Sequence, residues 1–230
     1  MDKIFENEEL AKYYERYGIE FNQTWPFSIE YFNKLEYFIG IDWSGVGNDV
    51  ENKQGEIERP VFYAARGSKH HHMACIKPKK SDGSRNPKYR DLDSIARVQN
   101  ITGGKELWYC AVDQLQLPKG VKVNDDYLTK IIIRLTERVN QEKKFNFSSL
   151  GILVDGWFKK KEKIVERLKR KDSKFSGKNI VSYEDGDRNI RIVSSADNVA
   201  YYLRNHYIET GEILRPDKRV FVGGDLNISQ

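Results

Sequence analysis

Cysteine is almost absent from the 230-residue sequence, which contains only Cys75 and Cys110 and no C-x-x-C pair. A disulfide framework and a cysteine-rich zinc site are therefore not expected, and an intracellular setting is favoured. No run of about 18 apolar residues occurs, so no membrane-spanning helix is predicted. The first residues are acidic and interrupted by charges, which does not fit a secretory signal. Together these features predict a cytoplasmic protein.

The composition is that of a chain with a buried core. Hydrophobic residues make up 39% and aromatic residues 12% of the sequence, too much apolar surface for a disordered chain. The length does not suffice for two full-sized domains. We predict a helical N-terminal appendage over residues 1–35, packed through Trp25, Phe27, Tyr31 and Phe32, and one main domain over residues 36–230.

Positive charge is concentrated in two segments. Residues 159–178 contain ten basic and three acidic residues, a local charge of +7, so the remaining residues sum to 5 − 7 = −2. Residues 76–90 contain six basic residues and one acidic residue, and their composition predicts a basic loop. Such segments suit a polyanion, although many Lys-rich helix faces are simply solvated. The predicted nucleic-acid contacts are Lys159, Lys160, Lys161, Lys163, Arg167, Lys79, Lys80 and Arg85.

Apolar patterning predicts strands that first follow one another and later alternate with helices. Continuous apolar runs are typical of strands buried on both faces, and apolar residues spaced three or four apart indicate helices. The predicted strands are 37–42, 61–65, 71–76, 107–112, 150–155, 180–183, 190–193 and 219–222. The predicted helices begin after Asn124, after Asp155 and at Ser194. This order predicts an α/β fold, a mixed sheet flanked by helices.

Two of the buried strands end in an aspartate, Asp42 and Asp155, and Asp197 lies in the first turn of the last predicted helix. Ligands of α/β sheets bind at the carboxyl ends of the strands. Three carboxylates close together repel one another unless a cation neutralises them, and an oxygen-rich set suits Mg²⁺ or Mn²⁺. Two such ions about 4 Å apart would activate a water molecule and stabilise the leaving oxygen of a phosphodiester.

Each aspartate also has a structural interpretation. An aspartate that closes a strand is common turn chemistry, and Asp155-Gly156 is a turn dipeptide. The sequence from Ser194 to Asp197 matches a capping box. Glu184, Asp185 and Asp187 form an acidic turn that we expect to be solvated, with the alternative that one of these residues assists the metal site.

The order of these motifs resembles the ribonuclease H-like superfamily. The sequence is also similar to a family of uncharacterised proteins with an I-D-E-S-G strand end and an L-A-D helix start. The matching segments are Phe38–Gly45, Ile152–Asp155 and Ser195–Ala200. The resemblance implies a ribonuclease H-like fold in which Asp42 and Asp155 bind metal and Asp197 completes a second metal site. Trp43 replaces the family's glutamate, so a fourth carboxylate is missing there.

Three further motifs have weaker functional interpretations. His70 and His72 could share one face of a strand and chelate a metal. Ser44 and Gly45 begin a glycine-containing loop that could cradle a phosphate, although the full phosphate-loop pattern is absent. Five aromatic residues could stack on bases, but core packing is the commoner role; these are Trp108, Tyr109, Trp157, Tyr201 and Tyr202.

The leading hypothesis is a Mg²⁺- or Mn²⁺-dependent nuclease that hydrolyses phosphodiester bonds of RNA or DNA. The first alternative is a nucleic-acid-binding or assembly protein of the same fold without turnover, which the missing glutamate at Trp43 motivates. The second alternative is a nucleotide-binding module that uses the loop after Asp42.

Overall fold

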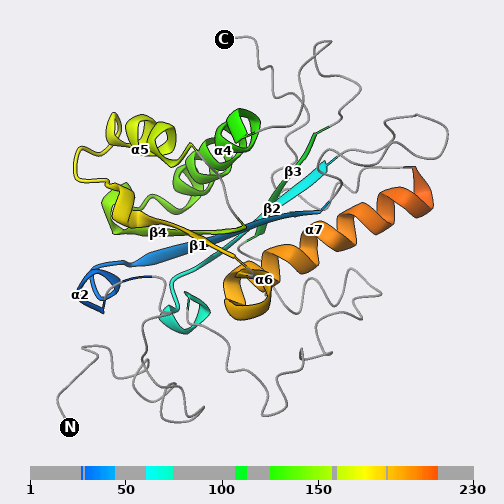
Figure 1. Ribbon diagram of the computed structural model, residues 1–230, viewed down its shortest axis with the longest axis horizontal. Coiled ribbons are helices and arrows are strands. Elements are labelled where there is room, and N and C mark those ends of the chain that lie inside the picture. The colour runs from blue at the N-terminus through cyan, green and yellow to red at the C-terminus, as the bar shows by residue number, and fades with distance from the viewer. Residues whose placement is uncertain are drawn as a thin grey trace, which may run out of the picture.

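The computed structural model describes residues 27, 29–44, 61–74, 107–112, 125–156, 160–184 and 186–211. Its centre is a five-stranded sheet in the order β3-β2-β1-β4-β5 (Figure 1). The strands are β1 Tyr37–Ser44, β2 Val61–Ser68, β3 Leu107–Val112, β4 Leu150–Asp155 and β5 Ile180–Tyr183.

The sheet is mixed. β2 is antiparallel to both β1 and β3, whereas β4 is parallel to both β1 and β5. Parallel neighbours need a crossover connection, usually a helix, and α4 (Asp125–Lys143) and α5 (Lys161–Lys169) lie in the connections that lead into β4 and β5. The predicted α/β fold with a mixed sheet flanked by helices is therefore confirmed.

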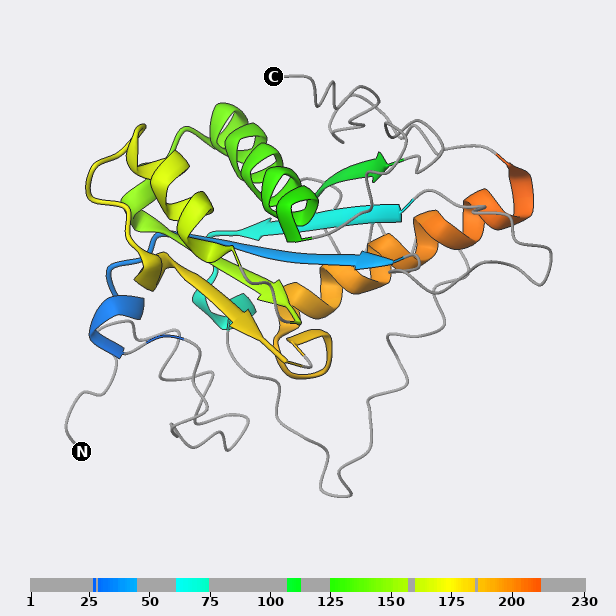
Figure 2. The same cartoon turned by 45° about the horizontal axis from the view of Figure 1, so that its top comes forward.

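Helices cover both faces of the sheet, as the two views show (Figures 1 and 2). Successive strand side chains point to opposite faces. Ile39 and Ile41 of β1 pack in the core cluster that includes α4 and α5, whereas Phe38 packs with Ile192 and Val193 of α7 (Arg191–Thr210). No helix in the described part of the chain is both long and apolar enough to span a membrane.

Gly40 allows α7 to approach the middle of β1. A Cβ atom at this position would lie 2.5 Å from the carbonyl carbon of Ile192 and 2.7 Å from the backbone nitrogen of Val193. Real Cβ atoms do not make such contacts, so only glycine lets the start of the helix rest directly on the strand. The approach places the next turns of α7 over the carboxyl-terminal part of β1.

The N-terminal segment packs through aromatic side chains. Phe27 and Phe32 are buried and contact Phe38 of β1, with Phe32 belonging to the short helix α2 (Ile29–Phe32). Tyr31 is partly buried and packs against the same cluster, so the packing agrees with the prediction for three of the four anchor residues. Trp25 and the rest of the predicted appendage before Phe27 lie outside the described residues.

Two predicted strands are wrong. His71–Ala74, expected to begin a strand, forms the 3-10 helix η1 instead, and the rings of Phe32 and Phe38 contact the edge of His71. Residues 190–193 were expected to be a strand, but only Ile190 makes a bridge and α7 starts at Arg191. The apolar side chains there face the sheet as part of one helical turn. The predicted strand at 219–222 lies outside the described residues.

Candidate metal centre

Asp42 and Asp155 occupy equivalent positions on neighbouring parallel strands. The register pairs Ile41 of β1 with Val154 of β4, and each aspartate is the next residue. Gly40 and Leu153, two residues earlier in each strand, both lie on the face that α7 covers. Because side chains alternate between faces, Asp42 and Asp155 also point to the α7 face, at the carboxyl edge of the sheet.

Asp197 reaches the same region from α7. It is part of the helix whose first residues rest on Gly40. The capping-box interpretation of Ser194 to Asp197 is wrong, because the helix begins three residues earlier and Ile190 is its N-cap. The Ser195 hydroxyl instead donates to the Arg191 carbonyl oxygen within the helix at 2.9 Å.

The electrostatics of Asp42 show that the carboxylates are neighbours. Burial raises the pKa of Asp42 well above its usual value, and the negative charges of Asp155 and Asp197 raise it further. The backbone N–H of Trp43, which donates to Asp42 Oδ1 at 2.7 Å, lowers the pKa of this carboxyl only in part. Ionised Asp42 is therefore destabilised in the folded chain.

The set fits a hard divalent cation by its chemistry, since every donor is a carboxylate oxygen and one is buried. Its spacing is wider than that of a ligand set. In the described ranges, no three Asp, Glu, His or Cys side chains stand close enough to hold a metal ion together. Repulsion between the negatively charged carboxylates favours this wider spacing, and a bound cation would favour a closer arrangement.

Asp187 is an acidic neighbour of the site. It lies in the short helix α6 (Gly186–Asn189), and its backbone N–H donates to Asp155 Oδ1 at 2.9 Å. Its negative charge also raises the pKa of Asp42. Asp187 is half-buried beside Asp155, which favours the alternative that a residue of this acidic turn assists the site. The dipeptide Gly186-Asp187, which begins three residues after the end of β5, was the available signal.

Gly186 leaves room for the Asp155 carboxylate. A Cβ atom on Gly186 would lie 3.0 Å from Asp155 Oδ1 and 3.3 Å from Val193 Cγ1. The turn at Asp155-Gly156 is also present, because Gly156 has a φ of +66° and its N–H donates to the Tyr183 carbonyl oxygen. The turn and the carboxylate site are compatible interpretations of the same residues.

The residues after Asp42 differ from the expected loop. β1 continues through Trp43 to Ser44, which pairs with Phe62 of β2. The Trp43 ring faces Tyr63 and comes within 3.9 Å of a Cβ placed on Gly156, so it packs on the face opposite Asp42. Gly45, the other predicted phosphate-loop residue, lies outside the described residues.

The predicted basic contacts are only partly described. Lys160 is the N-cap of α5, and Lys161, Lys163 and Arg167 belong to that helix. α5 packs on the sheet face opposite the carboxylates, and burial lowers the pKa of Lys161. The other predicted contacts, Lys159, Lys79, Lys80 and Arg85, lie outside the described residues.

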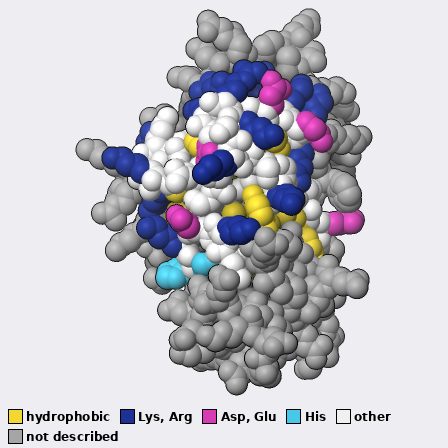
Figure 3. Space-filling view, turned by 90° about the vertical axis from the view of Figure 1, so that its left-hand side faces the viewer, with side chains coloured by type: hydrophobic (Ala, Val, Ile, Leu, Met, Phe, Trp, Pro, Cys, Tyr) yellow, Lys and Arg dark blue, Asp and Glu magenta, His cyan; other side chains and the backbone are white. Residues whose placement is uncertain are grey.

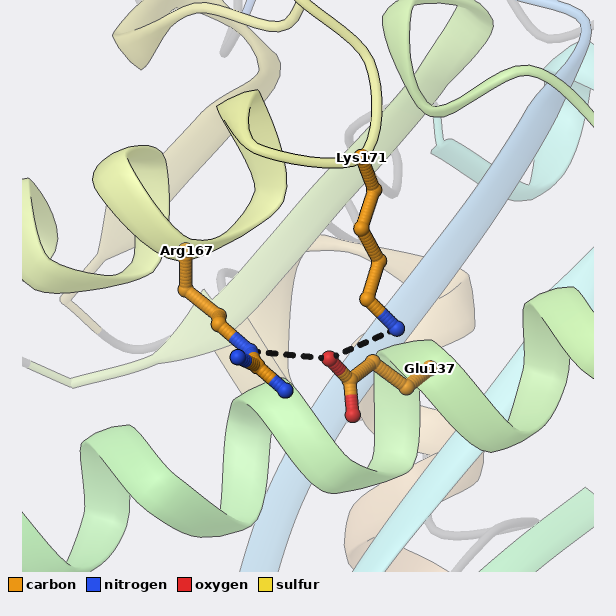
Figure 4. A network of polar contacts seen from close by, with 3 residues as sticks. All are labelled: Glu137, Arg167 and Lys171. Carbon is orange, nitrogen blue, oxygen red and sulfur yellow. Dashed lines mark hydrogen bonds and ion pairs between the residues drawn. The ribbon is translucent and has the colours of Figure 1, made fainter.

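Arg167 makes an ion pair within the fold. Its Nε lies 3.2 Å from Glu137 Oε1 of α4, and Lys171 Nζ lies 3.0 Å from the same oxygen (Figure 4). Glu137 is almost fully buried, so the two cations compensate a charge that burial would otherwise destabilise. Arg167 therefore connects α5 to α4.

Two of the five aromatic residues that could stack on bases have structural roles in the described part of the chain. Trp108 is buried, donates from Nε1 to Glu142 at 2.9 Å and lies beneath Lys143, and Tyr109 is buried in the core. Tyr201 is exposed, whereas Trp157 lies outside the described residues. His70 is exposed at the end of β2, and nothing is described of the His72 side chain.

No model of a known protein family matches this sequence, and no curated protein matches it significantly. Among solved structures, the chain is similar to one in the PCNA:RNase HII complex from Archaeoglobus fulgidus, with 16% identity, a TM-score of 0.35 and coverage of 79% of this chain and 83% of that chain. Two structures of Bst-RNase HIII are also similar. The Q54A mutant has 13% identity, a TM-score of 0.43 and coverage of 90% and 67%.

The other Bst-RNase HIII structure contains Mn²⁺ and has 11% identity, a TM-score of 0.33 and coverage of 83% of this chain and 60% of that chain. These three structures are of ribonucleases H by name. Since every TM-score is below 0.5, the proposals that follow depend on the residues of this chain.

Proposed function

We propose that the protein is a Mg²⁺- or Mn²⁺-dependent nuclease with a ribonuclease H-like domain, acting on the phosphodiester bonds of nucleic acid. The observation that carries this proposal is the buried Asp42 carboxylate, whose charge is opposed by Asp155 and Asp197 from two other elements. Retaining a destabilised carboxylate among like charges is typical of functional sites.

Asp42 and Asp155 would hold the cation between their parallel strands, and Asp197 would approach it from α7. A bound Mg²⁺ or Mn²⁺ would supply an activated water and stabilise the leaving oxygen. The N–H groups of Trp43 and Asp187, which each donate to a carboxylate oxygen, would fix the orientation of Asp42 and Asp155. Such supporting contacts commonly change metal affinity by 10–100-fold.

The substitutions Asp42→Asn and Asp155→Asn test the proposal. Each keeps the side-chain shape but removes a negative ligand, so we expect Mn²⁺-dependent cleavage of single- and double-stranded RNA and DNA to fall by more than about 100-fold. The rise in melting temperature on adding Mn²⁺ should also be lost. Glu36→Gln, at an exposed residue before β1, is the matched control and should retain both. Cleavage that survives in both aspartate variants would refute the nuclease.

A second function is favoured by one observation. The carboxylates of the described residues are not gathered tightly enough to hold an ion, and Trp43 stands where the resembling family has a glutamate. A nucleic-acid-binding or assembly protein without turnover fits this arrangement. Salt-sensitive binding to RNA or DNA, with no cleavage under Mg²⁺ or Mn²⁺, would identify it.

A further inference from the structure

The amino ends of β1, β4 and β5 form the edge of the sheet opposite the carboxylates, since these strands run parallel. The segments that lead into them converge on the 3-10 helix η4 (Phe147–Ser149) and the first residue of β4. The backbone N–H of Glu36 donates to the Ser149 carbonyl oxygen at 2.8 Å. The backbone N–H of Ser148 donates to Asp172 at 2.7 Å. Both bonds tie neighbouring segments to η4.

Asn179 adds a third connection, and it is fully buried. Its side-chain amide donates to the carbonyl oxygens of Ser148 at 3.0 Å and Leu150 at 2.8 Å. Asn179 ends the 3-10 helix η5 (Gly177–Asn179), which has a capping box at Ser176. The amino-end edge is therefore a hydrogen-bonded scaffold.

This scaffold presents a set of exposed lysines, here called the amino-edge lysines. They lie close in sequence to the connecting residues and belong to the segments before β1, before β4 and before β5; they are Lys34, Lys144, Lys169, Lys174 and Lys178. The acidic residues of the same segments are Glu36 and Asp172, so the five lysines and these two residues sum to 5 − 2 = +3. Arg170 and Lys171 of the same segments are left out of this sum because they pair with glutamates of α5 and α4.

The space-filling view of this side shows Lys and Arg side chains around the described surface, with few acidic side chains between them (Figure 3). Asp172 also accepts the N–H groups of Ser148 and Lys174, so its carboxylate is committed to the turn. Other cations nearby are committed to ion pairs, Arg167 and Lys171 with Glu137 and Arg170 with Glu166.

We propose that the amino-edge lysines bind the sugar–phosphate backbone of a nucleic acid, as a surface separate from the carboxylate edge. This inference rests on the nucleic-acid part of the proposed function. Asp42, Asp155, Asp187 and Asp197 make the carboxylate edge acidic, and an acidic edge repels phosphates. Without bound cations, affinity for a polyanion therefore has to come from another surface, and the amino-edge lysines supply positive charge on a fixed scaffold.

The separation of the two edges defines the class of ligand. A strand of six residues, as in β4, spans roughly 20 Å at about 3.3 Å per residue. Nucleotides are about 3.4 Å apart along a duplex, so one nucleic acid that touches both edges must be longer than roughly six nucleotides. The surface is suited to a polymer and not to a mononucleotide.

The double variant Lys174→Gln/Lys178→Gln tests this surface, with Lys130→Gln/Arg134→Gln as its control. The control removes the same charge from exposed positions in the amino-terminal half of α4. Fluorescence anisotropy would measure binding to labelled single-stranded and duplex oligonucleotides of roughly 30 nucleotides in EDTA, over a salt series. The absence of divalent metal prevents cleavage during the measurement.

We expect the Kd of Lys174→Gln/Lys178→Gln to rise at least about tenfold near 0.1 M salt, and the salt slope to decrease by roughly 1.5, while the control stays near the wild type. Equal weakening in both double variants would mean a long-range charge effect and would overturn the proposal. Wild-type binding by Lys174→Gln/Lys178→Gln would overturn it too. So would capture of the protein by phosphatidylserine vesicles without binding to the oligonucleotides.

The outcomes separate this inference from the nuclease. Lysine-dependent binding by a protein that never cleaves would retain the inference and remove the nuclease. Cleavage that depends on Asp42, together with unchanged binding by Lys174→Gln/Lys178→Gln, would retain the nuclease and remove the inference.

Discussion

At the scale of single residues, Asp42 is held where its ionisation is unfavourable. Burial, followed by the charges of Asp155 and Asp197, raises its pKa above the 3.8 of an unperturbed aspartate. The folded chain then binds a proton more tightly than the unfolded chain, so stability falls as the pH rises through the pKa of folded Asp42. Below about pH 3.8 both states are protonated, and the penalty vanishes.

Asp42→Asn should therefore stabilise the metal-free protein at neutral pH, because it removes a buried negative charge without changing the side-chain shape. We expect a gain on the order of 1 kcal/mol at pH 7, or about 2–4 °C in Tm. The gain should shrink toward zero as the pH is lowered to the value of a free aspartate. Thermal unfolding in EDTA across this pH range measures it, and a less stable variant at pH 7 would contradict the electrostatic account of Asp42.

Asp172 provides a control of opposite sign. Burial raises its pKa, but hydrogen bonds from Ser148 and Lys174 outweigh burial and lower the pKa overall. Its stabilising contribution is present above the pKa of an unfolded aspartate and is lost as the pH falls through the pKa of folded Asp172. Asp172→Asn should thus destabilise at pH 7, by no more than about 1 kcal/mol because the carboxylate is largely solvated.

The sequence predicts the position of a residue best where that residue follows a buried apolar run. Asp42 and Asp155 each end a continuous apolar run, so the sequence places them at a strand end. Asp187 gave no such signal, because its contribution depends on how the turn after β5 folds back onto β4. That contact is made by the backbone N–H of Asp187. Since every residue except proline carries a backbone N–H, the residue type at this position does not predict the contact.

At the scale of elements, long apolar runs predicted strands well. The bounds expected for β3, β4 and β5 agree with the structure. The segment 190–193 failed because its apolar residues suit a buried strand and the buried side of a helix equally well. Its helical state depends on Gly40 of a distant strand. Because Gly40 has no side chain, the Ile192 backbone can pack directly against β1.

Gly40→Ala should displace the start of α7 and destabilise the fold. The new Cβ would overlap backbone atoms of Ile192 and Val193, and an added methyl in a packed interior costs about 1–3 kcal/mol. Urea unfolding measures the loss. Gly177→Ala is the control, since its Cβ would come no closer than 3.7 Å to a neighbouring atom, the Cε of Lys161, and it should change stability little. Equal stability of Gly40→Ala and the wild type would show that α7 does not need this close approach.

At the scale of the whole molecule, the sheet separates the charges. The acidic groups lie at its carboxyl edge, and the amino-edge lysines lie at its amino edge. The sequence showed that residues 159–178 carry the excess positive charge, and it predicted nucleic-acid contacts for Lys159, Lys160 and Lys161 shortly after Asp155. In the structure α5 runs back along the opposite face of the sheet toward the amino edge, so much of that charge lies away from Asp42. The position of α5 depends on which face of the sheet the connection from β4 to β5 crosses. The spacing of charged residues in the sequence does not determine that face.

The buried amide of Asn179 connects distant parts of the chain at that amino edge. Its Oδ1 accepts from the Ser176 backbone N–H and from the Tyr31 hydroxyl, while its Nδ2 donates to Ser148 and Leu150. Asn179→Ala leaves several buried polar groups without these bonds, each worth about 1–3 kcal/mol, so we expect a loss of about 3 kcal/mol or more.

Urea unfolding of Asn179→Ala beside Tyr31→Phe separates the contributions to this network. Tyr31→Phe removes a single hydroxyl contact with the N-terminal segment and should cost only about 0.5–1.5 kcal/mol. If the amide joins the segments into one cooperative unit, both variants should unfold in one transition with an unchanged m-value. A separate early transition in Tyr31→Phe would instead mean that α2 unfolds independently. The cooperative network around Asn179 would then include only η4 and η5.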